Sequence, residues 1–445
     1  MEQDLTQGGV MSRLFHFALP LLFANVLQSL YNLVDMAIVG RFVGSAGLAA
    51  VSSSAMICYV LTSICMGVTT GGGVLVAQYH GAGDPAGRQA MQGALFSLSA
   101  LTAALLTLVS YLAYAPVLRL MSVPAEAMVP ALDYMAVFCA GTPFVLGYNA
   151  FCAVLRGVGD SKSPLVFVAL ASVVNVVLDL VMVGALGMGT AGAAWATVVA
   201  QAVSCLAAYL LLRRRGYLKG LRYAPDLPRW GRILRIGLPS AVQLSVVNLS
   251  YLFSTGMFNV FGTAAAAAAG VGLKLNTFAA MPCWAIGQGV TTMAGQCMGH
   301  GDPDRAGRTA KAGLVLALGV SVVTAVLVFA CAPWLIALFD PSPAVVEAGA
   351  LYLRICCSVN FIAYTAMYVL DSFATGVGCP TLGMVNALLH SVGMRLGLSW
   401  LFAFALGRGY LGLCWAEMLA PFPCALVGAV FFLRGRWREK NVIGA

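Results

Sequence analysis

Four acidic residues lie inside strongly apolar stretches of this sequence. They are Asp35, Asp179, Asp371 and Glu417, and each is surrounded by runs of apolar residues. An ionised side chain inside hydrocarbon is costly, so such residues usually face a cavity or a partner and mark ion or substrate pathways. We interpret the other twelve acidic residues, which lie in tails, loops or the ends of apolar runs, as solvated charge.

Two of these acids lie on polar stripes at helical spacing. Gln28, Asn32 and Asp35 share one face of a helix, because residues three and four apart are neighbours there. Asn175 precedes Asp179 by one helical turn and forms a second stripe of the same kind. Apolar residues flank both stripes, so we expect the polar faces to turn toward a cavity or another helix rather than toward lipid.

These stripes carry the groups that an ion-coupling site needs. Carboxylate and amide oxygens can bind a hard monovalent cation, and Thr197 can add a hydroxyl. Two buried carboxylates can instead hold a proton, because desolvation and mutual repulsion disfavour the doubly charged state. The predicted ion-coupling residues are Asp35, Asp179, Asn175, Thr197, Gln28 and Asn32. The alternative for each acid is interhelical hydrogen bonding that only joins helices.

Membrane-spanning helices must position these residues. Of 445 residues, 60% are apolar or aromatic and 9% are charged, and the mean hydropathy is +0.89. Soluble globular proteins contain roughly 25% charged residues, so a water-soluble fold is excluded. A helix crosses a bilayer with about 20 apolar residues. The apolar runs number about twelve, at roughly 14–39, 47–77, 90–115, 128–155, 164–184, 190–212, 233–261, 270–297, 311–338, 346–373, 381–405 and 410–433.

The basic residues predict the orientation of these spans. If the N-terminus is cytoplasmic, 19 of the 25 Lys and Arg residues lie in cytoplasmic connectors and tails, as the positive-inside rule requires. Eight of them lie between Arg213 and Arg235, a stretch that we interpret as a topology anchor on anionic lipid. We therefore expect a multi-pass protein of the plasma (inner) membrane with both termini cytoplasmic. The lipid bilayer is its expected partner; we expect a monomer and no nucleic-acid partner.

The two halves of the chain repeat one another with an offset of 218 to 220 residues. Six spans in each repeat would make both halves enter the membrane in the same direction. The matched motifs are Leu19-Pro20 with Leu238-Pro239, Gly81-x-Gly83-Asp84-Pro85 with Gly299-x-Gly301-Asp302-Pro303, Gly157-Val-Gly159 with Gly376-Val-Gly378, and Gly187 to Ala196 with Gly407 to Ala416.

This duplication predicts the fold class and the domain organisation. We expect an all-α polytopic membrane protein with about twelve transmembrane helices in two six-helix lobes related by a pseudo-twofold axis. The predicted N-lobe covers 1–212, a basic cytoplasmic linker covers 213–235, and the C-lobe covers 236–445.

The order and spacing of the motifs resemble the multidrug and toxic compound extrusion (MATE) transporters. The motifs are Leu19-Pro20, Gln28, Tyr31-Asn32-x-x-Asp35, Gly40, Gly81-x-Gly83-Asp84, Arg156-Gly157-x-Gly159-Asp160 and Asn175-x-x-x-Asp179. The resemblance covers essentially the whole chain. It implies two lobes around a central cavity, alternating access, and export of organic cations against protons or sodium ions. In the branch that this chain resembles, it also implies a cation site in the N-lobe that includes Gln28.

The C-terminal half departs from the family's other pattern, in which a glutamate in the seventh span and an aspartate in the tenth bind the cation. This chain has the segment Leu244–Asn248 at the first position, and its counterpart of the aspartate lies near Tyr364. We therefore do not expect a C-lobe carboxylate site of that type.

The remaining two in-span acids have open roles. Asp371 either faces a cavity or pairs with a base in a loop. Glu417 aligns with Thr197 in the repeat, and it either pairs with Arg395 or Lys274 or contacts substrate.

Aromatic and methionine side chains would suit a plastic cavity for flat organic cations, through cation–π and thioether contacts. Packing between helices is the alternative for each of them. The predicted substrate-cavity residues are Tyr148, Tyr251, Met281, Trp284, Asp371 and Glu417.

We predict a secondary antiporter that exports cationic amphipathic drugs or toxins in exchange for protons or sodium ions. No cofactor is expected, and no metal other than sodium at Asp35 and Asp179. The alternative is a lipid-linked oligosaccharide flippase of the same superfamily, but its pyrophosphate cargo would need several buried bases, and this chain has two against four in-span acids. The sequence lacks HExxH, GxSxG and GxxxxGK[ST] motifs, so we expect neither an enzyme nor an ATP-driven pump.

Overall fold

The computed structural model of the protein describes residues 3–121 and 123–439, and within them it contains helices and no strand. Eleven of the described helices are long and apolar enough to cross a membrane, and a bent pair of helices supplies a twelfth span. The predicted all-α polytopic fold is therefore confirmed. Lys440, which belongs to the predicted C-lobe and basic tail, lies outside the described residues.

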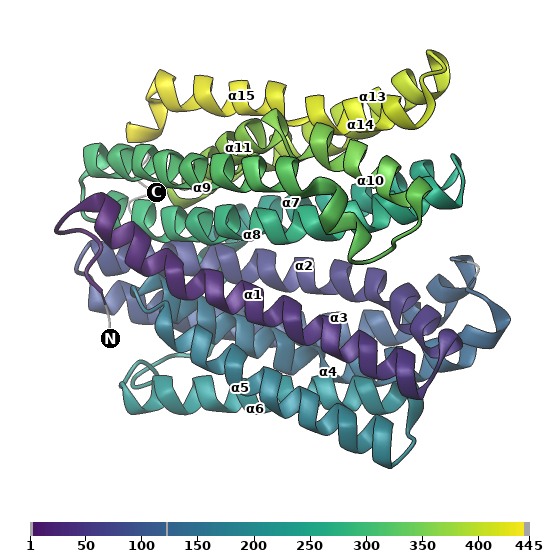
Figure 1. Ribbon diagram of the computed structural model, residues 1–445. Coiled ribbons are helices and arrows are strands. Elements are labelled where there is room, and N and C mark those ends of the chain that lie inside the picture. Colours follow the sequence, from purple (N-terminus) through teal and green to yellow (C-terminus); the bar gives the residue numbers. More distant parts are fainter. Residues whose placement is uncertain (1–2, 122, 440–445) are drawn as a thin grey trace. The chain divides into compact units, whose positions relative to one another are not determined.

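The first half of the chain contributes six spans, coloured from purple to teal in Figure 1. In this half α4 packs against α2, α3, α5 and α6, and α5 lies beside α6. The last turns of the fifth span form a π-helix, η1, whose hydrogen bonds join residues five apart. The elements are α1 (Val10–Phe42), α2 (Ser45–Gly81), α3 (Pro85–Leu120), α4 (Ala125–Gly157), α5 (Lys162–Asp179), η1 (Leu180–Ala185) and α6 (Gly189–Arg214).

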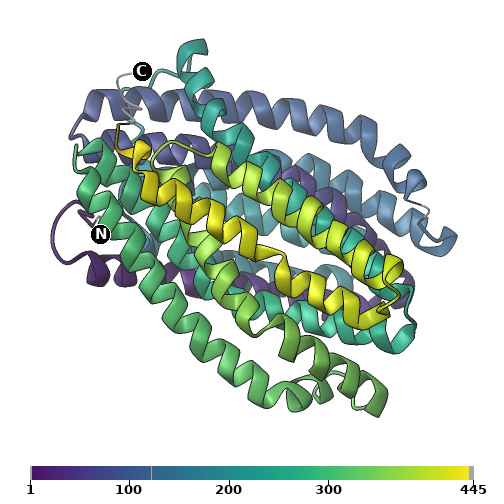
Figure 2. The ribbon, with the colours of Figure 1, turned by 90° about the horizontal axis from the view of Figure 1, so that it is seen from above.

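The second half repeats this order with more interruptions (Figure 2). Its counterpart of α4 is broken into α10 and α11, which are bent by 49°, and Pro421 separates α14 from α15 in the last span. The elements are α7 (Leu227–Asn259), α8 (Thr263–Gly299), α9 (Pro303–Ala337), α10 (Pro343–Cys356), α11 (Val359–Gly376), α12 (Thr381–Leu388), η2 (Leu389–Leu396), α13 (Gly397–Ser399), η3 (Trp400–Ala405), α14 (Gly409–Leu419), α15 (Pro421–Arg434) and η4 (Arg436–Glu439).

These helices group into two compact units whose boundaries fall inside α1 and α7. The first unit holds Met1–Asp4 and Phe23–Ala241, and the second holds Leu5–Leu22 and Val242–Ala445. The predicted lobes instead assigned the whole of the first span to the N-lobe. The two boundaries inside helices follow closely after a proline, Pro20 in α1 and Pro239 in α7, where a helical backbone hydrogen bond is missing.

The start of α1 belongs to the second unit because its apolar face is buried there. Leu14 and Phe17 are fully buried in a cluster with Val290, Val369 and Phe373 of that unit. Because these residues lie in a membrane span, what their burial adds relative to lipid contact is close van der Waals packing. The first turns of α1 are therefore part of the second unit's core.

The start of α7 belongs to the first unit because glycines let it approach α2 closely. A Cβ atom added to Gly71 would lie 2.3 Å from the carbonyl oxygen of Ile233, and one added to Gly67 would lie 2.4 Å from Cβ of Ala241. Neither position accepts a larger side chain without a shift of the backbone. Small residues at helix contacts are typical of membrane bundles.

The Arg156–Asp160 motif forms the turn between α4 and α5. The buried carboxylate of Asp160 accepts hydrogen bonds from the backbone amides of Lys162 and Ser163 and from the Ser163 hydroxyl. Arg215, which follows α6, donates to the same carboxylate at 2.5 Å. Burial opposes ionisation of this carboxyl, but the hydrogen bonds from Ser163 and the charge of Arg215 outweigh it and lower the pKa of Asp160. This part of the motif therefore ties the connector to the end of α6.

Substitution of Asp160 by Asn is expected to lower the free energy of unfolding by about 1.5–3 kcal/mol, the usual worth of hydrogen bonds to a charged group. Because the folded-state pKa of Asp160 lies below its unfolded value of about 3.9, the wild-type stabilisation is present at neutral pH. It is lost as the pH falls through the folded-state pKa. The difference between the two proteins should therefore shrink in acid. Thermal unfolding of the purified proteins across this pH range measures both effects.

A matched control is Asp340→Asn, which alters a surface-loop carboxylate that accepts hydrogen bonds from Ser342. We expect it to leave the stability close to that of wild type, as surface substitutions usually do. Equal stability of Asp160→Asn and wild type at neutral pH would contradict the role given to Asp160.

Candidate ion-coupling site

Asp35 and Asp179 meet inside the first unit. Asp35 lies in the part of α1 that follows Pro20, and Asp179 is the last residue of α5 before the π-helix η1. Their carboxyl groups lie within hydrogen-bonding reach of each other. Asp179 is fully buried and Asp35 is half-buried. The structure thus brings together two carboxyl groups that lie 144 positions apart in the numbering.

No donor in the described part of the chain satisfies this carboxyl pair. Oδ1 of Asp35 and both carboxylate oxygens of Asp179 are buried and have no hydrogen-bond partner among the described residues. Ionised carboxylates only accept hydrogen bonds, so two that face each other repel. A proton or a small cation between them removes this repulsion. The pair therefore has the chemistry of a proton or cation site.

Asn175 and Thr197 extend the set of oxygen atoms. The Asn175 amide donates to the Thr197 hydroxyl at 3.4 Å, which orients the side chain. Oδ1 of Asn175 is buried and has no donor among the residues that the structure describes. Because Asn175 precedes Asp179 by four residues, the two side chains share a face of α5. Carboxylate, amide and hydroxyl oxygens are thus gathered at one end of this helix.

Two tyrosines that are not among the predicted ion-coupling residues lie near the pair. Tyr31 of α1 and Tyr134 of α4 both interact electrostatically with Asp35 and Asp179. Tyr31 belongs to a motif that the sequence displays, so that motif was a usable signal. Tyr134 carries no local signal, because α4 comes close to the pair only through helix packing.

The rest of the α1 stripe is less closely involved. Gln28 is exposed and hydrogen-bonds with Tyr31, so its link to Asp35 is indirect. Asn32 is exposed on the helix surface. Of the predicted stripe, Asp35 is therefore the residue that reaches Asp179 directly.

The two acids of the second unit have partners of their own. Asp371 is buried and accepts a 2.6 Å hydrogen bond from the Asn386 amide, so its partner is not the loop base that the sequence suggested. Glu417 forms a buried ion pair with Arg395, with 2.9 Å between Nε and Oε2. Lys274, the other candidate partner of Glu417, is exposed.

The predicted aromatic and thioether cavity residues make packing and hydrogen-bond contacts. Tyr148 lies in the first unit, whereas the other predicted members lie in the second. Met281 is buried at 1% exposure, and the Trp284 indole donates to the Tyr364 hydroxyl at 2.9 Å. The ring of Tyr251 lies against the Arg395 side chain. These contacts do not assemble the six residues into one cavity within a unit.

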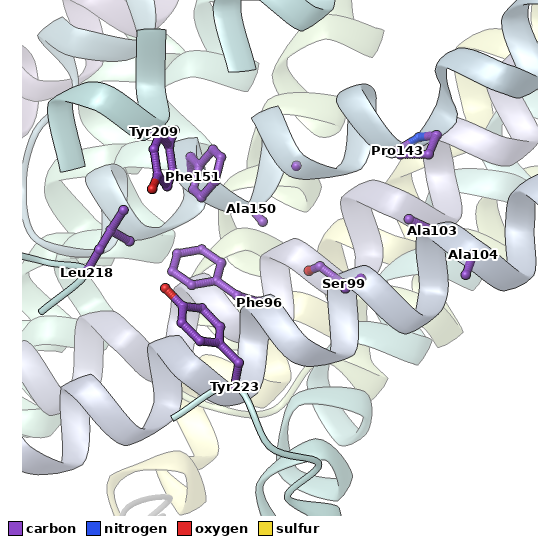
Figure 3. A pocket seen from close by; sticks show the side chains of 12 residues that line it. Phe96, Ser99, Ala103, Ala104, Pro143, Ala150, Phe151, Tyr209, Leu218 and Tyr223 are labelled. Carbon is purple, nitrogen blue, oxygen red and sulfur yellow. The ribbon is translucent and has the colours of Figure 1, made fainter. Parts of the chain in front are cut away.

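The first unit contains a pocket of about 550 Å³ that is lined by α3, α4, α6 and the connector after α6. Figure 3 shows the aromatic side chains of Phe96, Phe151, Tyr209 and Tyr223 around it. Its lining is mainly apolar and includes none of the predicted ion-coupling or cavity residues. This pocket is therefore separate from the carboxyl pair.

In the described part of the chain, twelve apolar spans lie in two repeated halves, and the first and fifth spans each carry an acid without a hydrogen-bond donor; these features define a duplicated, polytopic membrane transporter. The MatE family model matches residues 20–181 and 239–401, one match in each repeat, and the chain belongs to this family. The resemblance inferred from the sequence motifs is thereby confirmed. Members of the family are transporters, so the expectation that the chain is not an enzyme is also confirmed.

Known proteins resemble the chain along nearly its full length. The probable multidrug resistance protein YpnP of Bacillus subtilis is 28% identical over 99% of this chain and 98% of its own length. A FAD transporter of Shewanella oneidensis is 26% identical over 95% of this chain and 94% of its own. A structure of a MOP superfamily transporter from Pyrococcus furiosus, titled for the reverse polarity of its binding pocket, has a TM-score of 0.92 at 21% identity and 98% coverage of both chains. That likeness shows a shared fold.

Proposed function

We propose that the protein is a secondary antiporter that exports cationic amphipathic molecules in exchange for protons or sodium ions bound at Asp35 and Asp179. The observation that carries this proposal is a buried pair of carboxyl groups without a hydrogen-bond donor among the described residues. Membership of the MatE family and similarity to a probable multidrug resistance protein support export of toxic molecules.

The carboxyl pair couples the ion to a change of conformation by differential affinity. A ligand shifts a two-state equilibrium only as far as it binds one state better than the other. A neutralised pair tolerates close approach of α1 and α5, whereas a doubly charged pair is repelled. Ion binding then favours one packing of these helices, and ion release favours the other.

The charges in the spans favour a cationic cargo over a pyrophosphate cargo. Arg395 is engaged by Glu417, and Lys274 is exposed. Neither of these two bases, among the described residues of the spans, is a free buried cation that could bind a pyrophosphate group. This observation weighs against the oligosaccharide flippase alternative.

Transport into inverted vesicles, with a proton or a sodium gradient imposed separately, tests the proposal. The probes are a fluorescent lipophilic cation such as ethidium and, because one relative is named a FAD transporter, FAD itself. We expect one of the two gradients to drive accumulation of the cation and neither to drive FAD. Accumulation of FAD alone, or indifference of cation transport to both gradients, would overturn the proposal.

The proposed orientation, with both termini cytoplasmic, predicts which side of the membrane each connector faces. In a variant without the thirteen native cysteines, a cysteine at exposed Lys219 should react with an impermeant thiol reagent only from the cytoplasmic side. A cysteine at exposed Glu126, near the start of α4, should react only from the other side. Labelling of intact cells compared with inverted vesicles measures this difference. The reverse pattern would show that the orientation is inverted.

A further inference from the structure

The two repeats differ in length by one residue near the ion-coupling site. Gly157-Val-Gly159 matches Gly376-Val-Gly378 at an offset of 219, whereas Gly187 matches Gly407 at an offset of 220. The second repeat therefore has one extra residue between these landmarks.

A π-helix accommodates this extra residue. The π-helices η1 and η3 match each other at an offset of 220, and η2, over Leu389–Leu396, has no counterpart in the described part of the first repeat. A π turn takes up one more residue than an α turn, and such turns are frequent at functional sites. The insertion thus lies in η2, and the register after it follows the offset of 220.

This register assigns counterparts to the four residues Asp35, Asn175, Asp179 and Thr197. Asp35 corresponds to Ser254, at the offset of 219 that Pro20 and Pro239 share. Counted back from η3 at the offset of 220, the counterparts of Asn175, Asp179 and Thr197 are Arg395, Ser399 and Glu417. The second repeat therefore replaces two carboxylates with one carboxylate and one guanidinium group.

Three of these counterparts, Ser254, Arg395 and Glu417, form a hydrogen-bonded cluster inside the second unit, whereas the buried Ser399 hydroxyl has no partner among the described residues. The Arg395 guanidinium donates through Nε to Glu417 at 2.9 Å and through its Nη1 to the Ser250 hydroxyl at 3.0 Å. The Ser254 hydroxyl donates to the other Glu417 oxygen at 2.8 Å, so both carboxylate oxygens are satisfied. The guanidinium carbon lies 4.1 Å from the centre of the Tyr251 ring. The Arg395 and Glu417 side chains are only 4% and 6% exposed.

We propose that the second unit carries the counterpart of the first unit's cation site, with the Arg395 guanidinium as its permanent cation. Each chain then has a single exchangeable ion site, in the first unit, and Glu417 takes no coupling ion. The comparison with Asp35 and Asp179 rests on the proposed function, but the occupied cluster stands on its own contacts. Removal of the Arg395 side chain should expose a latent site on Glu417 that binds a guanidinium ion.

The cluster provides what such a ligand needs. A guanidinium ion can donate to Glu417 and Ser250 in the plane of its fork, and Tyr251 offers a ring face at cation–π distance. A sodium ion cannot reproduce this planar set of donors. The latent site should therefore prefer guanidinium to sodium.

Chemical rescue of Arg395→Ala in purified protein tests the proposal. Thermal unfolding is measured with millimolar guanidinium or methylguanidinium, below denaturing concentrations, and with sodium as a matched salt. We expect Arg395→Ala to unfold more readily than wild type and to be restabilised by guanidinium. At a ligand concentration about 100 times its Kd, the ratio of folded to unfolded protein should rise about 100-fold. Wild type should show no such rise, because its own side chain fills the site.

The double variant Arg395→Ala/Glu417→Gln is the matched control, because it removes the carboxylate that should bind the added ion. Absence of rescue in Arg395→Ala, or equal rescue in this double variant, would overturn the proposal. If Arg395→Ala does not fold, Arg395→Lys provides a second test through its ammonium group. It should remain folded and be less stable than wild type, and guanidinium should have no effect on it, because the lysine occupies the site. Restabilisation of Arg395→Lys by guanidinium would count against a filled site.

These outcomes do not depend on transport. If the Asp35 proposal fails and guanidinium rescue succeeds, the filled site in the second unit stands without the coupling role of the first. If rescue fails while Asp35 proves essential for coupling, only the inference about the second unit is lost.

Discussion

Asp35→Asn is expected to abolish ion-coupled export while leaving folding and membrane insertion intact. Asn retains the shape of Asp but removes the charge that a proton or sodium ion must neutralise. The pair with Asp179 then contains a single carboxylate, and ion binding no longer relieves a repulsion between two. Gradient-driven accumulation in inverted vesicles with matched amounts of protein should fall at least about tenfold, which corresponds to about 1.4 kcal/mol.

The matched control for this experiment is Asp133→Asn, which removes an exposed acid of α4. It should transport at the wild-type rate. A well-expressed Asp35→Asn protein with wild-type export would show that the coupling ion binds elsewhere.

The second large effect is expected for substrate affinity when both acids of the first unit are replaced. In wild type, the affinity for a cationic substrate should change by about 5- to 150-fold between conditions that fill and empty the ion site, the usual span of coupling between two sites. Asp35→Asn/Asp179→Asn should erase this dependence on pH and on sodium. The reason is that the remaining amides have no charge for an ion to neutralise. Titration of a fluorescent cation into purified protein, across pH and sodium concentration, measures the effect.

Neutral replacements in the second unit should leave the dependence in place. They are Asp371→Asn and the double variant Arg395→Gln/Glu417→Gln. The last two residues are replaced together, because removing one partner of a buried ion pair leaves an uncompensated charge. If the dependence survives loss of Asp35 and Asp179 but disappears in Arg395→Gln/Glu417→Gln, the coupling site lies in the second unit.

The sequence by itself determined the class of fold and the two acids of the proposed site. Apolar runs, separated by basic connectors, predicted about twelve spans, and motifs repeated at a constant offset predicted the duplication. Helical spacing linked Asn175 with Asp179 on one face of α5. Hydropathy and helical spacing are properties of residues that are close in sequence, so a single chain displays them.

The tertiary structure decided which distant segments of the chain pack against one another. It assigned the start of α1 to the second unit through Leu14 and Phe17, which no local pattern distinguished from the rest of that span. It placed Tyr134 near the carboxyl pair and tied Asp160 to Arg215. Each of these relations joins residues that are far apart in the sequence.

The structure also chose between alternatives that the sequence left open for Glu417. Lys274 and Arg395 were both candidate partners. Glu417 pairs with Arg395, and Lys274 is exposed. Arg395 lies in η2, the π-helix that takes up the extra residue. A one-residue insertion rotates a helix by about 100° per residue, so the face that a side chain presents depends on where the extra residue is absorbed. The composition of the sequence and the spacing of its motifs do not show where the extra residue is absorbed. That position follows from backbone hydrogen bonds and helix packing, which exist only in the folded chain.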